Sequence, residues 1–490
     1  MKWGLVAVLF LALVPAIYAD WLQFQHDAMH TGLQGGSGGN FSFINFTLNK
    51  GMNFQPLIAD IDNNQKKEIV LFYDNTLQVR SGNLSSIANI TVGKLLGQPI
   101  LYNTDSDDYF EIIFNANNSG THYLFVYEYN NGFIQEKNIS VQNGLQGAGI
   151  TCKDNYCVFM DNAQYVHIVS LPSFSDEPFN TSSFVDVDEK IPAIADIDND
   201  GHDEAVFWHD QNNDNEYGLM AFDLVDKKFD PIFKNATIDE IATPPGINGN
   251  NVEKKGQPVL VDLNNDGNLE IAVSMLYDDA LPLFNANDWF MELFVINSSG
   301  TASFRRCEMV SGPLATRCGE GSSSGTIERG TNPFILDANN DGKYDICFLK
   351  DKKRPDTYTF ETMTISCYNH IGENLLESKI SFPTDRHISA TIADMNNDGK
   401  MEVLTLSGIF LLNGTRVFAY AFDPSHPLKS DSENYVIPSD IDGNGLLDLI
   451  YTQQGFTMVF KQNVSETAIT TIPEESLLEK YAPVLYFHPD

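Results

Sequence analysis

Short apolar runs alternate with acidic, glycine-containing loops along most of the chain. In the stretch IPAIADIDNDGHDEAVFW, which covers residues 191–208, two apolar runs flank one such loop. Apolar runs of this length, rich in branched and aromatic side chains and bounded by turn residues, are typical of buried strands. The pattern therefore predicts a hairpin of two buried strands joined by an acidic turn.

The same unit of strand, acidic hairpin, strand, turn and strand recurs along the sequence. Its acidic nonapeptides begin at Asp60, Asn103, Asp196, Asp262, Asp337, Asp394 and Asp440. The interval between the second and third copies is about twice the shortest interval, which indicates a hidden repeat. The segment 147–172 lies inside that interval and has the same rhythm without the acidic ligands. We therefore count eight units.

Repeats of this size, with three or four short strands each, predict an all-β fold. We expect a β-propeller with seven or eight blades, eight being favoured, and with the acidic hairpins between strands. A parallel β-helix and a row of β-sandwich domains are the alternatives, and the unequal intervals count against the β-helix. We place the propeller at residues 20–466 and expect the segment DWLQFQHDAMHTG (20–32) to supply a strand that completes the last blade.

The two ends of the chain differ from the repeats. Residues 1–19 combine Lys2, an apolar core and a small residue at the cleavage point, so they predict a secretory signal peptide. No other segment approaches about 18 consecutive apolar residues, so we expect no transmembrane segment in the mature chain. Residues 467–490 are interpreted as a linker or as the truncated start of another domain.

Composition supports an extracellular protein. The 66 acidic and 30 basic residues give a net charge of −36, which disfavours nucleic acid and anionic membranes as partners. Six cysteines, an even number, fit an oxidising compartment. Their spacing favours the disulfides Cys152–Cys157, Cys307–Cys318 and Cys347–Cys367 among the possible pairings, and six buried free thiols are the alternative. N-x-S/T sequons predict surface positions open to glycosylation at Asn40, Asn45, Asn83, Asn89, Asn117, Asn138, Asn180, Asn235, Asn297, Asn413 and Asn463.

The crowded carboxylates of the acidic loops predict bound cations. Ca²⁺ takes six to eight oxygen ligands, and alternating Asp and Asn residues on a tight loop direct such oxygens inward. Two carboxylates about 4 Å apart repel by roughly 4 kcal/mol at an effective dielectric constant near 20. A single loop of this kind could be an ordinary turn, because Asp, Asn and Gly are common turn residues. About a third of all the acids lie in these loops, however, and the flanking strands distinguish them from EF-hands.

The repeats resemble the FG-GAP/VCBS family of calcium-binding propeller repeats, which occurs in integrin α-subunit heads and in many secreted proteins. The resemblance covers roughly residues 20–462. It implies side-chain ligands at loop positions 1, 3, 5 and 9, a backbone carbonyl ligand at position 7, and about five to seven structural Ca²⁺ ions. The side-chain positions are Asp60, Asp62, Asn64, Glu68, Asn103, Asp105, Asp107, Glu111, Asp196, Asp198, Asp200, Glu204, Asp262, Asn264, Asp266, Glu270, Asp337, Asn339, Asp341, Asp345, Asp394, Asn396, Asp398, Glu402, Asp440, Asp442, Asn444 and Asp448.

The first two loops depart from the family pattern. Gln65 and Asp108 stand where the other loops have glycine, and Asn103 replaces the first aspartate of its loop. We expect these two sites to be weaker or empty.

No catalytic motif that we searched for occurs, including G-x-S-x-G, H-E-x-x-H and the phosphate and dinucleotide loops. We therefore predict a secreted or cell-surface, calcium-stabilised propeller that acts in adhesion or ligand recognition, with a protein or glycan ligand at one face. The long excursion 276–294 is a candidate contact region, or simply a long outer hairpin. A carbohydrate-active enzyme resembling polysaccharide lyases and a purely structural surface component are the alternatives.

Overall fold

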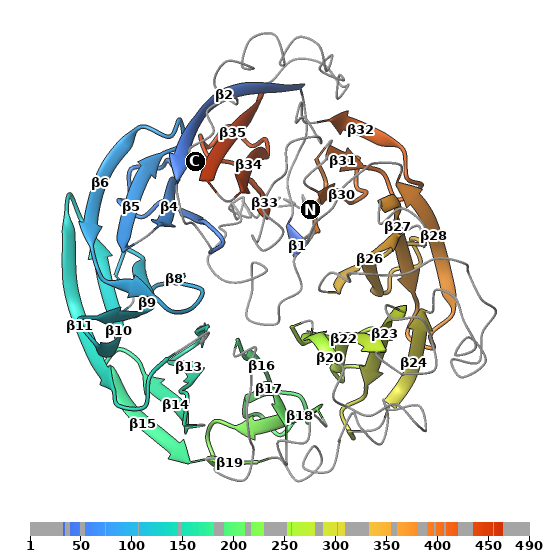
Figure 1. The fold of residues 1–490 in the computed structure, drawn as a ribbon, viewed down its shortest axis with the longest axis horizontal. Coiled ribbons are helices and arrows are strands. Elements are labelled where there is room, and N and C mark those ends of the chain that lie inside the picture. The colour runs from blue at the N-terminus through green and yellow to red at the C-terminus, as the bar shows by residue number, and fades with distance from the viewer. Residues whose placement is uncertain are drawn as a thin grey trace, which may run out of the picture.

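The computed structural model is a ring of eight small sheets around a central axis (Figure 1). The structure describes residues 33–34, 40–49, 54–180, 191–229, 252–308, 333–380, 390–419 and 435–463, apart from short gaps inside these ranges. All regular secondary structure in this part of the chain is β-strand. The predicted all-β propeller and the preference for eight blades are confirmed.

The first four blades follow one another along the chain. Blade 1 contains β3 (Leu57–Ala59), β4 (Glu68–Tyr73), β5 (Thr76–Ser81) and β6 (Ser86–Thr91). Blade 2 contains β7 (Lys94–Leu95), β8 (Ile100–Tyr102), β9 (Glu111–Asn118), β10 (Thr121–Tyr129) and β11 (Phe133–Val141). Blade 3 contains β12 (Thr151–Lys153), β13 (Tyr156–Met160), β14 (Tyr165–Ser170) and β15 (Ser175–Asn180). Blade 4 contains β16 (Ala193–Ala195), β17 (Glu204–Asp210), β18 (Tyr217–Asp223) and β19 (Lys228–Phe229).

The remaining four blades complete the ring. Blade 5 contains β20 (Val252–Lys255), β21 (Val259–Val261), β22 (Glu270–Asp279), β23 (Asp288–Ile296) and β24 (Ala302–Glu308). Blade 6 contains β25 (Phe334–Leu336), β26 (Asp345–Lys353), β27 (Phe360–Tyr368) and β28 (Asn374–Ile380). Blade 7 contains β29 (Thr391–Ala393), β30 (Glu402–Thr405), β31 (Gly408–Phe410), β32 (Arg416–Ala419) and β1 (Leu33–Gln34). Blade 8 contains β33 (Tyr435–Ser439), β34 (Asp448–Gln453), β35 (Gly455–Asn463) and β2 (Asn40–Asn49).

The strands next to the central axis are short and apolar. The sequences LIA in β3, AIA in β16, VLV in β21 and FIL in β25 are buried at every residue. Continuous apolar runs are expected where a strand is covered on both faces. The outer strands β6 and β11 instead expose most of their residues, as strands facing solvent do. The sequence thus places the core between blades.

Apolar clusters fill the contacts between neighbouring blades. Blades 3, 4 and 5 share one cluster around Trp208, which is 1% exposed. The contact between blade 8 and blade 1 is filled in the same way, by Ile437 and Ile450 from one blade and Ile58 and Ile69 from the other. Because the last blade packs on the first as the others pack on their neighbours, the ring is closed and no terminal apolar face is left in water.

An N-terminal strand also closes the ring through hydrogen bonds. β2 pairs antiparallel with β35 along the outer edge of blade 8, from Asn40 opposite Asn463 to Asn49 opposite Gly455. β1 joins blade 7 by pairing parallel with β29. The closing strand is therefore formed by residues 40–49, whereas the segment 20–32, which we expected to complete the last blade, lies outside the described residues together with the predicted signal peptide and the tail 467–490.

Two of the three predicted disulfides are present. Cys152 faces Cys157 across β12 and β13, and Cys347 faces Cys367 across β26 and β27, and both pairs are bonded. The third pair is not tested, because Cys318 lies outside the described residues. Predicted surface positions of sequons are confirmed at Asn83, Asn89, Asn138, Asn180 and Asn413, which are exposed.

Candidate metal-binding loops

Seven acidic loops occupy equivalent places in the propeller. Each loop joins the short inner strand of its blade to the next strand along the chain, with β1 pairing on the inner side of β29 in blade 7, so all seven loops occupy equivalent places near the axis of the ring. The ninth residue of every loop is the first residue of that second strand. In chain order, loops 1 to 7 are residues 60–68, 103–111, 196–204, 262–270, 337–345, 394–402 and 440–448.

The aspartate at position 1 holds the turn in shape. In loop 3, Asp196 Oδ1 accepts the backbone N–H of Asp200 at 3.1 Å, and Oδ2 accepts that of Gly201 at 3.0 Å. Five further loops repeat both bonds, with Asp60, Asp262, Asp337, Asp394 and Asp440 as acceptors. The bonds gather the backbone around the carboxylate and fix the positions of the residues between them.

Two further hydrogen bonds recur in all seven loops. The side chain at position 5 accepts the N–H of position 7, as Asp200 does from His202 at 2.8 Å; the equivalent acceptors are Asn64, Asp107, Asp266, Asp341, Asp398 and Asn444. The acid at position 9 accepts the N–H of position 2 with one oxygen, as Glu204 does from Ile197 at 2.8 Å; the equivalents are Glu68, Glu111, Glu270, Asp345, Glu402 and Asp448.

The backbone conformation explains the Asn and Gly residues of the pattern. In loop 3, Asn199 and Gly201 have φ values of 61° and 91°, in the left-handed region that side chains other than Asn, Asp and Gly rarely adopt. Gln65 takes the same conformation in loop 1, with φ of 67°. Loop 1 therefore keeps the common geometry despite its substituted glycine, at a conformational cost.

The ligand positions converge in a way that suits a hard cation. In loop 1, Asp60, Asp62 and Glu68 at positions 1, 3 and 9 place oxygens within 4.8 Å of one another, and loop 3 forms the same cluster; in loop 2 the three acids are Asp105, Asp107 and Glu111, at positions 3, 5 and 9. Asp62 Oδ1, Asn264 Oδ1 and Glu111 Oε1 are buried without a hydrogen-bond partner. Buried oxygens without partners are costly. An oxygen-coordinated divalent cation would satisfy them, so the residues present fit such an ion.

The acids at position 9 are electrostatically unfavourable in their ionised form. Burial, helped by the charges of Asp62 and Asp60, raises the pKa of Glu68 from 4.5 to about 8. Burial, with smaller effects from Asp198 and Asp223, raises the pKa of Glu204 to about 8 as well. Burial likewise raises the pKa values of the other five, to about 7 for Glu111, Glu402 and Asp448 and to about 6 for Asp345, and it raises the pKa of Glu270 above its usual 4.5. A positive charge in the loop would restore ionisation at neutral pH.

Individual loops differ from this common plan. In loop 2, Asn103 donates to the carbonyl of Asp107 at 2.5 Å instead of holding the turn as Asp does elsewhere. In loop 7, Lys461 places its ammonium group 3.2 Å from Asp442 at position 3. Of the predicted ligands, Asn396 in loop 6 lies outside the described residues.

Neighbouring loops are joined to one another. Asn199 of loop 3 donates its side-chain N–H to Asn268 Oδ1 of loop 4 at 2.8 Å, and Asn265 of loop 4 donates to the carbonyl of Gly342 in loop 5 at 2.9 Å. Loop 7 meets loop 1 through a backbone bond from Lys67 to Ile441 at 3.1 Å. An ion that ordered one of these bonded loops would therefore also support the loop bonded to it.

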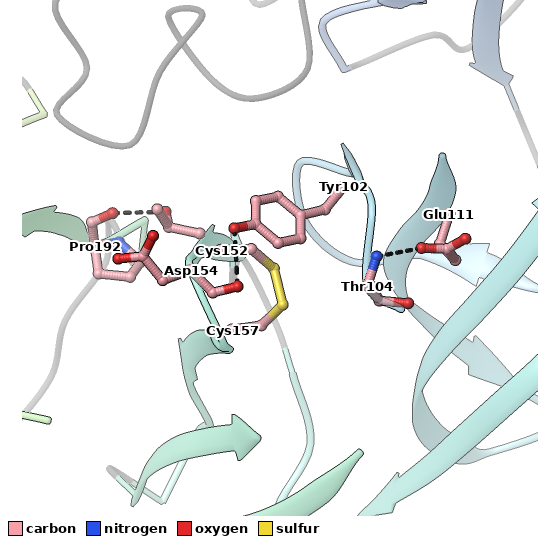
Figure 2. The surroundings of a disulfide bond; sticks show 8 residues. Tyr102, Thr104, Glu111, Cys152, Asp154, Cys157 and Pro192 are labelled. Carbon is pink, nitrogen blue, oxygen red and sulfur yellow. Dashed lines mark hydrogen bonds between the residues drawn. A yellow bond between two sulfur atoms is a disulfide. The ribbon is translucent and has the colours of Figure 1, made fainter. Parts of the chain in front are cut away.

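Blade 3 has a disulfide where the other blades have an acidic loop. The turn between β12 and β13 is closed by Cys152–Cys157, and Tyr102 of blade 2 donates its hydroxyl to the carbonyl of Asp154 in this turn at 3.2 Å (Figure 2). On the other side, Tyr156 donates to Asp203 of loop 3 at 2.6 Å. The short hairpin thus connects the loops on either side of it, which confirms the degenerate unit expected at 147–172.

Sequence analysis missed Glu128, Glu136, His202 and Asp223, which lie close to the predicted ligands Glu111 and Asp200. Glu111, Glu128 and Glu136 of blade 2 cluster within 4.8 Å, as do Asp200, His202 and Asp223 of blade 4. Glu128, Glu136 and Asp223 lie on strands outside the loops, so strand pairing brings them to the loop residues, and no local motif points to them.

Comparison with known proteins supports the fold. No protein-family model matches the sequence, and no curated protein matches it. Sqt1 of Saccharomyces cerevisiae is similar with a TM-score of 0.50 and 10% identity, over 87% of this chain and 100% of that one. The biofilm matrix protein Bap1 of V. cholerae has a TM-score of 0.46 and 10% sequence identity, over 92% of each chain. The C-terminal WD40 domain of Sif2 has a TM-score of 0.39 and 12% identity, over 87% of this chain and 100% of that one. At these identities the similarity concerns the fold alone.

Proposed function

We propose that the protein is a secreted or cell-surface β-propeller whose acidic loops bind Ca²⁺ and whose ring presents a recognition surface for a protein or glycan ligand. The observation that carries the calcium assignment is the common hydrogen-bond frame of the seven loops, which brings three acids within 4.8 Å in loops 1 to 3. Such carboxylates repel by roughly 3–4 kcal/mol per pair at an effective dielectric constant near 20. A bound cation removes that cost.

Calcium suits these loops better than magnesium does. Ca²⁺ accepts an irregular set of six to eight oxygens, including carbonyl oxygens, whereas Mg²⁺ requires a near-ideal octahedron and retains its waters. The ligands of each loop come from a single hairpin, as Asp196 and Glu204 of loop 3 illustrate. The role we assign to the ions is therefore structural: they hold the inner hairpins in the shape that lets adjacent loops bond.

Extracellular location and ligand recognition rest on separate observations. Two disulfides fit an oxidising compartment, and the exposed sequons fit a glycosylated surface. Within the described residues, no helix has the length and apolar character needed to cross a membrane. Propellers present broad, rigid end faces, where loops carry binding residues on a fixed scaffold. The enzyme alternative rests on fold analogy alone.

The calcium assignment is tested by metal analysis of the full chain. Wild-type protein and the double variant Asp266→Ala with Asp341→Ala are dialysed against Ca²⁺ at neutral pH, and bound calcium is measured by elemental analysis. We expect the variant to lose about two ions per chain, because each substitution removes a position-5 ligand. The variant Glu177→Gln, on the outer strand β15, serves as control and should bind as wild type does.

The recognition function is tested separately. The chain is applied to a glycan array and used to capture proteins from cell surfaces, in Ca²⁺ and in EDTA. Binding that requires Ca²⁺ supports the proposal, whereas equal calcium content in wild type and the double variant refutes the metal assignment whatever the array shows.

A further inference from the structure

Blade 2 brings together glutamates from three neighbouring strands. Glu111 begins β9, Glu128 lies on β10 directly opposite it, and Glu136 lies on β11. One carboxylate oxygen from each lies within 4.8 Å of the other two. Acids placed directly opposite each other destabilise an antiparallel pair. An arrangement of three requires a compensating positive charge.

A β-bulge produces this arrangement. The pairing of β10 with β11 shifts between Val126 and Tyr127, so that Val126 faces Lys137 and Tyr127 faces Gln135. Glu136 is the extra residue between the two pairs and has no direct partner across the ladder. Bulges commonly redirect a side chain at a functional position. Here the bulge accompanies a partly exposed carboxylate that reaches the buried pair of acids.

The burial and bonding of Glu111 indicate that a ligand is needed. Glu111 is fully buried, and its Oε2 accepts the backbone N–H of Thr104. Its Oε1 is buried as well and has no hydrogen-bond partner. None of the ion pairs between described residues includes Glu111, Glu128 or Glu136. Glu111 thus has one buried carboxylate oxygen without a partner and lies in a cluster with two other acids, with no counter-charge among the described ion pairs.

We propose that Glu111, Glu128 and Glu136 bind a divalent cation at a second site in blade 2, next to loop 2. Only oxygen atoms are offered, and carboxylates are hard ligands, so the ion belongs to the class of Ca²⁺ and Mn²⁺. Glu111 also lies within 4.8 Å of Asp105 and Asp107 in the loop, so its carboxylate is shared between the two clusters. An ion in loop 2 would therefore share Glu111 with this second site.

This site offers an explanation for the unusual loop 2. Loop 2 lacks the position-1 aspartate, because Asn103 stands there, and it also lacks the glycine at position 6. The strands of the same blade supply two additional acids, Glu128 and Glu136, so the blade keeps a high density of ligands by another route. The proposal depends on the proposed calcium loops only through the shared residue Glu111.

The test compares bound metal in the full chain and in the variant Glu128→Gln with Glu136→Gln. Both proteins are saturated with Ca²⁺ or with Mn²⁺ and dialysed, and the metal per chain is measured by elemental analysis. We expect the variant to bind about one ion fewer than wild type. The variant Glu177→Gln removes one acid from the outer strand of blade 3 and should keep the wild-type count.

Thermal unfolding distinguishes binding from a structural role. In EDTA the double variant should melt at the wild-type temperature or higher, because two repelling charges are gone, and Ca²⁺ should raise its melting temperature less than it raises that of wild type. If the double variant binds as many ions as wild type and Ca²⁺ raises its melting temperature by as much, this proposal is overturned. The proposal that the acidic loops bind Ca²⁺ would then be unaffected. A wild-type chain that binds no ion overturns both proposals, and the single variant Glu136→Gln repeats the test at a partly exposed position.

Discussion

The metal-free protein should lose stability as pH rises from about 5 to about 8. Burial raises the pKa of the position-9 acids Glu68 and Glu204 to about 8, and those of Glu402 and Asp448 to about 7. In the unfolded chain the same groups titrate near 4.5 or 3.8. Between these values the folded protein binds more protons than the unfolded chain, so stability is fully present below the unfolded pKa and declines as pH rises through the folded pKa.

The magnitude follows from one loop. For Glu204, a rise in pKa from 4.5 to about 8 corresponds to at most roughly 5 kcal/mol at neutral to alkaline pH. Exposed loop neighbours such as Asp200 let solvent screen the carboxyl, which reduces this to roughly 2 kcal/mol. For a chain of this size, about 1 kcal/mol changes the melting temperature by roughly 1 °C. The six position-9 acids whose pKa values rise to about 6 or above, which are Glu68, Glu111, Glu204, Asp345, Glu402 and Asp448, should together lower the melting temperature by on the order of 10 °C between pH 5 and pH 8.

Bound Ca²⁺ should reverse the direction of this pH dependence. The ion requires ionised ligands, so protons compete with it and its binding strengthens as pH rises. Melting curves recorded by circular dichroism at several pH values, in EDTA and in Ca²⁺ at equal ionic strength, therefore should have opposite slopes. The variant Glu204→Gln should melt above wild type in EDTA at pH 8 and below it in Ca²⁺, whereas Glu177→Gln should follow wild type in both. Equal slopes in EDTA and Ca²⁺ would refute the reasoning.

Two further predictions concern features of single blades. Replacing both cysteines of the Cys152–Cys157 disulfide by serine should lower the free energy of unfolding by about 2 kcal/mol, because the bond closes only a short loop in the unfolded state. Urea unfolding measures this change, and an unchanged midpoint would contradict the prediction. Gln65→Gly should stabilise loop 1 by about 1 kcal/mol, because Gln65 has a left-handed φ of 67° that glycine adopts without steric cost. The same substitution should tighten Ca²⁺ binding in isothermal titration calorimetry, and weaker binding would count against the assigned geometry.

The number of blades is predictable from the sequence because every blade repeats the same short apolar strands around a turn. Blade 3 keeps this rhythm when its loop is reduced to a two-residue turn, so its Cys152–Cys157 pair was predictable as well. The order of ligands within a loop is equally local, because Asp196 and Glu204 are separated by a single hairpin.

Features that depend on strand pairing were not predictable. β1 has two residues, and its parallel partner β29 lies near the other end of the chain. β2 does carry a signal, since the NFSFINFTLN sequence places Phe41 and Phe43 at alternate positions, yet a strand pattern does not name its partner. The cluster of Glu111, Glu128 and Glu136 depends on a register shift between β10 and β11, and no sequence motif predicts that shift.

The seam between β2 and β35 has a consequence for biosynthesis. During translation, β2 emerges among the first residues, whereas β35 follows only after seven blades have been made. Until then β2 carries unpaired backbone groups along a ten-residue strand, and such an edge readily pairs with the wrong chain. Completion of the ring therefore has to follow the synthesis of the other seven blades, and β2 stays without its native partner until then.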